Sequence, residues 1–141
     1  MSTFVVDASV AAKWFFPEPD SSYAEALLRP GTGLQAPDLL FSEIGNILWK
    51  RLVRKELDPQ RADAIIDRLT SAPLTIVPVS SLMPAALRIA HSFKRTFYDS
   101  AYLALAIREK CRLVTADTKL INALRNTAMS KHIVGISEKI T

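Results

Sequence analysis

The sequence contains a single cysteine, Cys111, among its 141 residues. One cysteine excludes an intrachain disulfide framework, so we expect a reducing compartment. Histidine is also scarce, with only His91 and His132 present. His91 falls within a predicted helix and His132 begins a predicted short strand, so neither forms an evident pair of a catalytic base and a residue that orients it. Acid–base catalysis by histidine is therefore disfavoured.

Long apolar runs are missing as well. No segment approaches the roughly 18 apolar residues that a membrane-spanning helix requires. The first residues do not read as a signal peptide, because they lack a basic leader and because Asp7 and Lys13 interrupt the apolar stretch. We therefore expect a soluble, cytoplasmic protein with no membrane partner.

The composition is that of an ordinary globular protein, with 49% hydrophobic and 23% charged residues. The length fits one domain over residues 1–141, and no internal repeat, low-complexity segment or linker is apparent. The formal net charge of +4 is compatible with a polyanionic partner without demonstrating one.

Short apolar segments alternate with helical patterns along the chain. Strands are predicted at residues 4–6, 74–79, 112–115 and 132–136. Helices are predicted at residues 9–16, 20–28, 37–52, 59–70, 82–93, 98–110 and 118–125. Strands that are joined through helices need crossover connections, which favour parallel pairing. The predicted fold class is α/β, with three layers (α/β/α) and a mostly parallel central sheet.

Two acids follow predicted strands. Asp7 comes directly after the apolar run Phe4-Val5-Val6, and Asp117 lies two residues beyond the strand at 112–115. In open α/β sheets, ligands bind outside the carboxyl ends of the strands, so these carboxylates are candidate site residues. Each also has an ordinary structural interpretation, because aspartate is a favoured N-cap of the helix that follows.

Two further acids lie within predicted helices. Glu43 shares a partly apolar face, where a carboxylate is uncommon unless it is paired or bound to a metal. The alternative is an exposed position beside Lys50. Asp99 stands at the start of its helix, on a face that continues as Tyr102 and Leu103. This face points the Asp99 carboxylate toward the interior or a cleft, although the helix dipole alone could explain an aspartate there.

The four acids have a stronger meaning together than apart. If they met within about 5 Å, each pair would repel by roughly 3 kcal/mol at an effective dielectric of about 20. The six pairs would then exceed the roughly 5–15 kcal/mol that stabilises a domain. A shared cation would remove this repulsion. Because the candidate ligands are all carboxylate oxygens, Mg²⁺ or Mn²⁺ is favoured over zinc.

Four segments carry these acids in order along the chain: Val5-Val6-Asp7-Ala8-Ser9, Ser42-Glu43-Ile44-Gly45-Asn46, Tyr98-Asp99-Ser100-Ala101-Tyr102-Leu103-Ala104-Leu105-Ala106 and Leu113-Val114-Thr115-Ala116-Asp117. Their order and spacing resemble the PIN-domain ribonucleases, and in particular the VapC-type toxins of bacterial toxin–antitoxin pairs. The resemblance covers essentially the whole chain, and none of the core acids is missing.

The resemblance implies a Mg²⁺-dependent endoribonuclease toxin that hydrolyses RNA phosphodiester bonds. Asp7 and Asp99 would be the principal metal ligands, and Glu43 and Asp117 would complete the acidic pocket. The hydroxyls of Ser9 and Thr115 match motif positions that would orient ligands or water, with helix capping as their alternative role. The implied partners are an RNA substrate, a cognate VapB-type antitoxin and a second copy of the chain in a homodimer.

An acidic pocket repels phosphate, so an RNA enzyme needs basic residues around it. Two groups of basic residues are candidates: Lys50, Arg51, Arg54, Lys55 and Arg61 in and after the long helix, and Lys94 and Arg95 before the Asp99 helix. Ordinary solvated helix faces are the alternative interpretation of both groups.

Two other functions stay open. One is a housekeeping PIN nuclease that has no antitoxin. The other is a receiver-like signalling module, which also binds Mg²⁺ through acids at strand ends. A receiver would carry adjacent acids after its first strand and a lysine just after a late strand. Here Asp7 has no acidic neighbour, and Lys119 falls within the following helix.

Overall fold

The structure is a computed structural model that describes residues 2–138. Its centre is a five-stranded sheet in the order β3-β2-β1-β4-β5, and every pairing is parallel. The strands are β1 (Ser2–Val6), β2 (Thr32–Pro37), β3 (Leu74–Val77), β4 (Arg112–Thr115) and β5 (Ile133–Gly135). The predicted class, α/β with a parallel central sheet, is confirmed.

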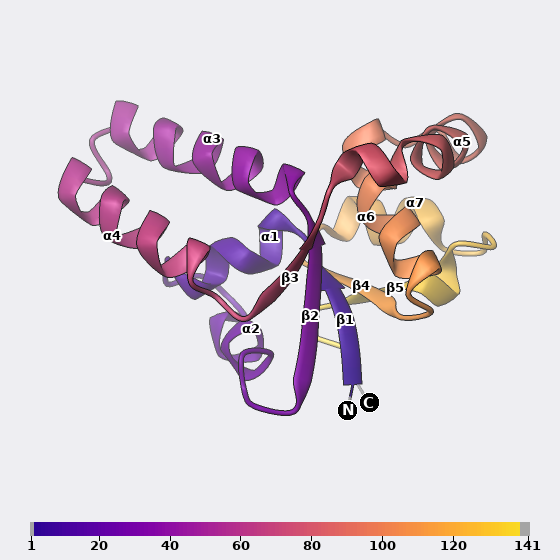
Figure 1. Cartoon of the computed structure of the whole chain (residues 1–141), viewed down its shortest axis with the longest axis horizontal. Helices are drawn as coiled ribbons and strands as arrows, with labels where there is room; N and C mark the ends of the chain where they lie inside the picture. Colours follow the sequence, from indigo (N-terminus) through magenta and orange to yellow (C-terminus); the bar gives the residue numbers. More distant parts are fainter. Residues whose placement is uncertain (1, 139–141) are drawn as a thin grey trace.

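Helices cover both faces of the sheet. Figure 1 shows α1, α2 and the α3–α4 pair on one face, and α5, α6 and α7 on the other. The α-helices are α1 (Ala8–Ala11), α2 (Ser21–Ala26), α3 (Leu39–Val53), α4 (Pro59–Thr70), α5 (Met83–Phe93), α6 (Phe97–Arg108) and α7 (Thr118–Leu124). Three short 3₁₀ turns complete the described chain: η1 (Ala12–Trp14), η2 (Val79–Leu82) and η3 (Ser130–His132).

The two central strands set the position of the site. Val5 and Val6 of β1 and Val114 of β4 are fully buried, as expected for apolar strands that are covered on both faces. Val6 pairs in register with Val114. The next residues along the chain, Asp7 after β1 and Thr115 at the end of β4, therefore lie side by side at the carboxyl edge of the sheet.

Strand β2 lies where the sequence predicts a loop and the start of a helix. Gly33 and Pro37 are poor strand formers, which conceals the strand from propensity. Leu34 and Ala36 are nevertheless buried, so the alternation of a strand is present in its centre. The predicted helix over residues 9–16 is also shorter than expected, because α1 ends at Ala11 and continues only as the turn η1.

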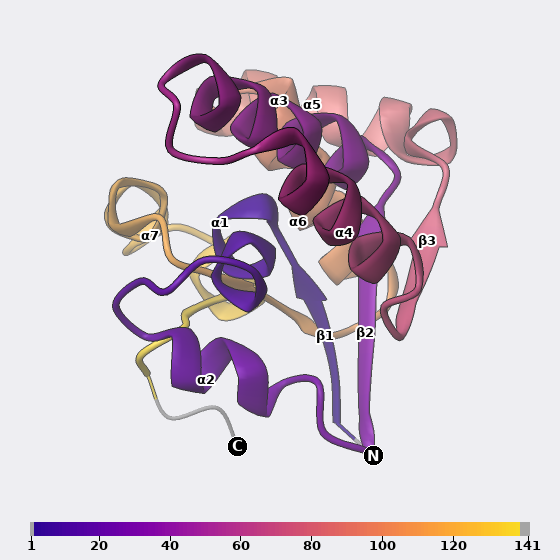
Figure 2. The same ribbon diagram turned by 90° about the vertical axis from the view of Figure 1, so that its left-hand side faces the viewer.

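The α3–α4 pair extends away from the sheet, and its two helices run side by side in both views (Figures 1 and 2). Two arginines of this helix pair contact the residues that follow η1. The Arg51 guanidinium lies 3.8 Å from the centre of the Phe16 ring, and Arg61 donates a hydrogen bond to the carbonyl oxygen of Phe15. Two of the basic residues considered for RNA binding therefore have partners within the protein. Within residues 2–138, no helix is both long and apolar enough to cross a membrane.

Candidate active site

Asp7 lies at the centre of a hydrogen-bond network at the carboxyl edge of the sheet. Ser9 Oγ donates to Asp7 Oδ1 at 2.6 Å, and Thr115 Oγ1 donates to Asp7 Oδ2 at 2.5 Å. Oδ1 also accepts the backbone N–H of Val10 at 3.2 Å, so Asp7 is the N-cap of α1. The capping interpretation of Asp7 is therefore confirmed, and its carboxylate also lies at the carboxyl edge of the sheet.

The same two hydroxyls hold the loop between β4 and α7. Ser9 Oγ accepts the backbone N–H of Ala116 at 2.9 Å, and Thr115 Oγ1 accepts that of Asp117 at 3.1 Å. Thr115 is fully buried. Ser9 and Thr115 thus link the Asp7 carboxylate to the segment that carries the fourth acid.

Glu43 projects from α3 toward α6, where the Tyr102 hydroxyl donates a hydrogen bond to Oε1 at 2.6 Å. Tyr102 is only 2% exposed, and Glu43 is partly buried. Glu43 forms no ion pair with Lys50 in the described structure. The exposed alternative for Glu43 is therefore wrong.

The other two acids occupy helix starts. Asp99 lies in the first turn of α6, and its backbone N–H donates to the N-cap hydroxyl of Thr96 at 3.1 Å. Asp117 is the N-cap of α7, because its Oδ1 accepts the backbone N–H groups of Lys119 and Leu120 at 3.0 and 3.2 Å. Asp117 Oδ2 accepts no hydrogen bond from residues 2–138.

The carboxyl groups influence one another. Burial raises the pKa of Asp7 to about 6, and the charge of Glu43 adds to the increase. The hydrogen bonds from Ser9 and Thr115 lower this pKa, but burial outweighs them. The pKa of Glu43 is raised by burial and by Asp99, and the pKa of Asp99 is raised by burial and by Asp117. The acids therefore form a chain of electrostatic neighbours in the order Asp7, Glu43, Asp99 and Asp117.

The donor set suits a hard divalent cation. It consists of carboxylate oxygens, and none of the four acids forms an ion pair within residues 2–138. A cation would relieve the burial and repulsion that raise their pKa values. Across the same residues, no three histidine, cysteine or acidic side chains are gathered closely enough to hold a metal ion. The four acids are thus electrostatic neighbours rather than a preformed metal-binding cluster.

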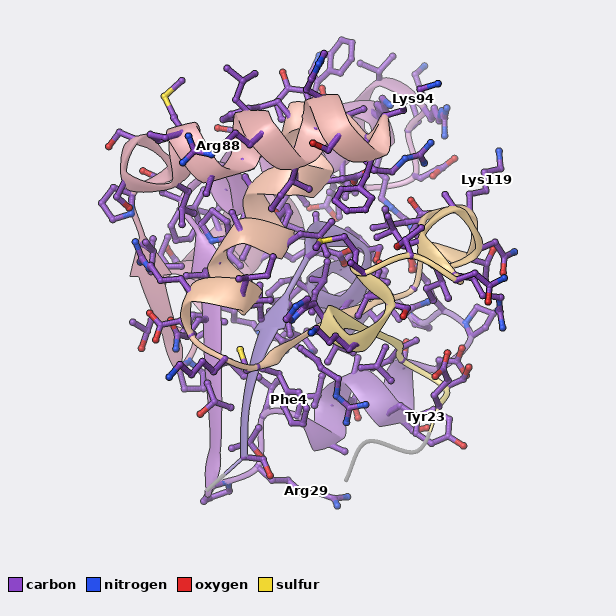
Figure 3. The ribbon with its side chains drawn as sticks, turned by 90° about the vertical axis from the view of Figure 1, so that its right-hand side faces the viewer. Phe4, Tyr23, Arg29, Arg88, Lys94 and Lys119 are labelled. Carbon is purple, nitrogen blue, oxygen red and sulfur yellow. The ribbon has the colours of Figure 1, made fainter. Side chains whose placement is uncertain are left out.

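Basic side chains flank this acidic edge. The charge of Arg95 lowers the pKa of Asp99, which places the guanidinium near that carboxylate, although burial and Asp117 outweigh its effect. Figure 3 shows Lys94 at the end of α5 and Lys119 at the start of α7, both toward the same edge of the molecule. Both lysines are exposed.

A separate cavity of about 620 Å³ opens at the amino ends of the strands, where its lining includes Phe4, Cys111, Lys131 and His132. Burial and the charge of Lys131 lower the pKa of His132. Because the acids lie at the carboxyl ends, neither this histidine nor the cysteine belongs to the acidic site.

Sequence reasoning missed the role of Tyr102. The signal was a phenol among the small and apolar residues of a buried helix, since a buried tyrosine hydroxyl usually has a hydrogen-bond partner. It also missed a cavity of about 420 Å³ next to Glu43, whose walls include Ser42, Asn46 and Tyr98. No sequence pattern predicts that cavity, because its lining residues come from three separate segments of the chain.

Comparisons with known proteins identify the family of this chain. The family model described as "PIN domain" matches residues 4–125. The protein named Ribonuclease VapC3 from Pyrobaculum aerophilum is 32% identical over 118 residues, which cover 82% of this chain and 90% of that protein.

Solved structures agree on the fold. The structure of VapBC2 from Rickettsia felis bound to a DNA fragment from their promoter contains a chain that superimposes with a TM-score of 0.67 at 16% identity, over 94% of this chain and 98% of that one. A toxin–antitoxin complex from Klebsiella pneumoniae gives a TM-score of 0.63 at 14% identity, over 99% and 100% of the two chains.

Proposed function

This chain belongs to the PIN-domain family of VapC-type ribonucleases, and we propose that it is a Mg²⁺-dependent endoribonuclease toxin. Its reaction is hydrolysis of RNA phosphodiester bonds at the pocket formed by Asp7, Glu43, Asp99 and Asp117. The match to the PIN-domain model over residues 4–125 leaves the receiver-like alternative without support.

One observation carries the proposal. Acids from four separate segments are neighbours at the carboxyl edge of the sheet, where burial and their mutual charge raise the pKa of three of them. Such an arrangement costs folding free energy, and no ion pair within residues 2–138 offsets that cost for these acids. Carboxylates kept together at a cost are typical of a site that binds a cation.

Each acid has a distinct part in the proposed reaction. Asp7 and Asp99 would hold the metal, and Asp117 would complete the pocket through Oδ2. Mg²⁺ (or Mn²⁺), when bound, would supply Lewis-acid chemistry that lowers the pKa of water and neutralises charge on phosphate. Glu43, fixed through Oε1 by Tyr102, presents Oε2 to take a proton from the attacking water. Ser9 and Thr115 hold the Asp7 carboxylate in one orientation.

The proposed partners follow from the same family. Because the structures of VapBC2 and of the Klebsiella pneumoniae complex contain toxin–antitoxin pairs, we expect a VapB-type antitoxin for this chain. We also expect a homodimer. Exposed apolar side chains are available for protein contacts, including Trp49 and Val53 on α3 and Leu87 on α5. Copurification with the product of a neighbouring small reading frame tests the antitoxin, and its absence would favour the housekeeping nuclease.

Cleavage of single-stranded RNA by the purified chain tests the activity. Cleavage should require Mg²⁺ and stop with EDTA, and Asp99→Asn should abolish it. Asp63→Asn is the matched control, because Asp63 is exposed on α4 and outside the acidic pocket. Parallel purification of the variants reveals contaminating nucleases. Equal cleavage by Asp99→Asn and the wild type would refute the site.

A further inference from the structure

The cavity of about 420 Å³ beside Glu43 is a separate compartment of the acidic edge. Glu43 forms part of its wall, and the other walls come from α1, from α3 and from the start of α6. Any group that fills the cavity therefore lies directly next to the carboxylate that would face the attacking water. Its volume falls within the roughly 300–1,000 Å³ that is usual for small-molecule sites.

The walls of the cavity are of two kinds. Leu39, Ile47 and the ring of Tyr98 supply apolar surface, and the Tyr98 side chain is 61% exposed. Ser42 and Asn46 supply a hydroxyl and an amide, neither of which forms a side-chain hydrogen bond with residues 2–138. An apolar and aromatic wall beside polar groups suits a flat heteroaromatic ring, because the faces of such a ring stack on aromatic side chains and its edge forms hydrogen bonds.

We propose that this cavity binds the base of a nucleotide adjoining the scissile phosphate, stacked on Tyr98 and contacted at its edge by Asn46 and Ser42. The proposal rests on the proposed ribonuclease function and deepens it, because it assigns the residues that select the sequence around the cleaved bond. Tyr98 and Asp99 are consecutive residues, so the stacking platform is covalently fixed to the metal-binding acid.

Cations near the acidic edge, rather than in the cavity wall itself, favour RNA over a protein segment as the occupant of the cavity. Lys94 and Arg95 immediately precede this part of the chain, and Lys94 is exposed toward the same edge as Lys119 (Figure 3). These cations can neutralise the phosphates on either side of a bound base. Arg95 lies near enough to Asp99 for its charge to act on that carboxylate, and Glu43 belongs to both the acidic pocket and the cavity wall, so cations, acids and cavity adjoin one another.

A binding experiment with abasic RNA tests the proposal. The protein is prepared in the Asp99→Asn background with Mg²⁺, in which RNA is bound without being cleaved, and is titrated into a fluorescein-labelled single-stranded RNA of mixed sequence. Further RNAs carry one abasic nucleotide at each position in turn. One abasic position should weaken binding by roughly 5- to 150-fold, the equivalent of about 1–3 kcal/mol of stacking.

Tyr98→Ala, added to this background, should weaken binding of the intact RNA by a similar factor and show no further loss at that abasic position. Tyr98→Phe should keep the affinity. Tyr23→Ala is the matched control, because Tyr23 is 53% exposed on α2, well away from Lys94 (Figure 3), and should bind like the parent. The proposal would be overturned if the affinity losses from Tyr98→Ala and from the abasic nucleotide add at every position of the RNA. It would also be overturned if Tyr98→Ala binds RNA as tightly as the parent, which is the result expected of a pocket for a protein partner. The coupling between Tyr98 and the abasic position is measured without cleavage. A wild-type protein that shows this binding pattern but does not cleave RNA would therefore contradict the proposed activity and leave the base-binding proposal intact.

Discussion

The hydroxyl of Tyr102 donates a hydrogen bond of 2.6 Å to Oε1 of Glu43, which joins α6 to α3 across the acidic edge. Burial and the nearby charges of Glu43, Asp7 and Asp99 raise the pKa of Tyr102, so the phenol stays protonated and remains a donor. The bond fixes one oxygen of Glu43 and leaves Oε2 without a protein partner in the described structure. Tyr102 is thus a positioning residue for Glu43.

Tyr102→Phe should slow RNA cleavage roughly tenfold, the equivalent of about 1.4 kcal/mol in the activation barrier. The phenylalanine keeps the buried ring and removes only the hydrogen bond, so the Glu43 carboxylate is free to rotate. We expect kcat to fall with little change in KM, and the free energy of unfolding to fall by about 1 kcal/mol. Steady-state kinetics and urea denaturation measure both. An unchanged kcat would show that Glu43 needs no such support.

Thr115→Val should destabilise the protein by about 1–3 kcal/mol, because the N–H of Asp117 loses its acceptor and the Asp7 carboxylate loses a donor. Cleavage should also decrease, since the Asp7 carboxylate is then held by Ser9 and Val10 alone. Thr115→Ser is the matched control, because it keeps the hydroxyl. Urea denaturation and cleavage rates compare the three proteins. If the valine and serine variants behave alike, the hydroxyl has no part in the site.

The parts of the fold that the sequence predicts are those with a local signal. The apolar run before Asp7 and the Pro59–Thr70 helix need no knowledge of distant residues, and both lie where the pattern places them. Strand β2 was missed because its pairing with β1 outweighs the poor strand propensity of Gly33 and Pro37. The same limit applies to the site. The order of the acids points to a shared pocket, whereas the bond between Tyr102 and Glu43 depends on how α6 packs beside α3.

Asp7→Asn should make the metal-free protein more stable at pH 8 while it abolishes cleavage. The folded protein raises the pKa of Asp7 from 3.8 to about 6, so between these values the folded state binds more protons than the unfolded state. This group therefore lowers stability as the pH rises through that window, by at most about 3 kcal/mol above pH 6. The cost is absent below pH 4.

Urea denaturation of the wild type and of Asp7→Asn in EDTA, from pH 4 to pH 8, measures this effect. The advantage of the asparagine variant should grow with pH and reach its full size above about pH 6. A variant that is equally destabilised at every pH would show that the hydrogen bonds of the carboxylate outweigh its burial.

Lys94→Gln and Lys119→Gln should each weaken RNA binding and reduce the slope of log Kd against log salt by about 0.7–1, as expected for the loss of one phosphate contact. Lys131→Gln is the matched control, because Lys131 lines the cavity at the opposite ends of the strands. Arg51→Gln should lower the stability and leave the salt slope unchanged, since Arg51 packs on Phe16. Fluorescence anisotropy at several salt concentrations gives the slopes. Equal slopes for all the lysine variants would place the RNA elsewhere.

Mg²⁺ should raise the melting temperature of the wild type by about 5–10 °C at a concentration 100 times its Kd, which corresponds to about 2.7 kcal/mol of binding free energy. The carboxylates repel one another in the metal-free protein, so the cation stabilises the folded state in which they are neighbours. KCl at the same ionic strength should give a much smaller shift, because screening acts weakly on buried charges. Asp7→Asn and Asp99→Asn should lose most of the Mg²⁺ effect, and Asp63→Asn should retain it. A shift of equal size in all four proteins would mean that the cation binds outside the acidic pocket.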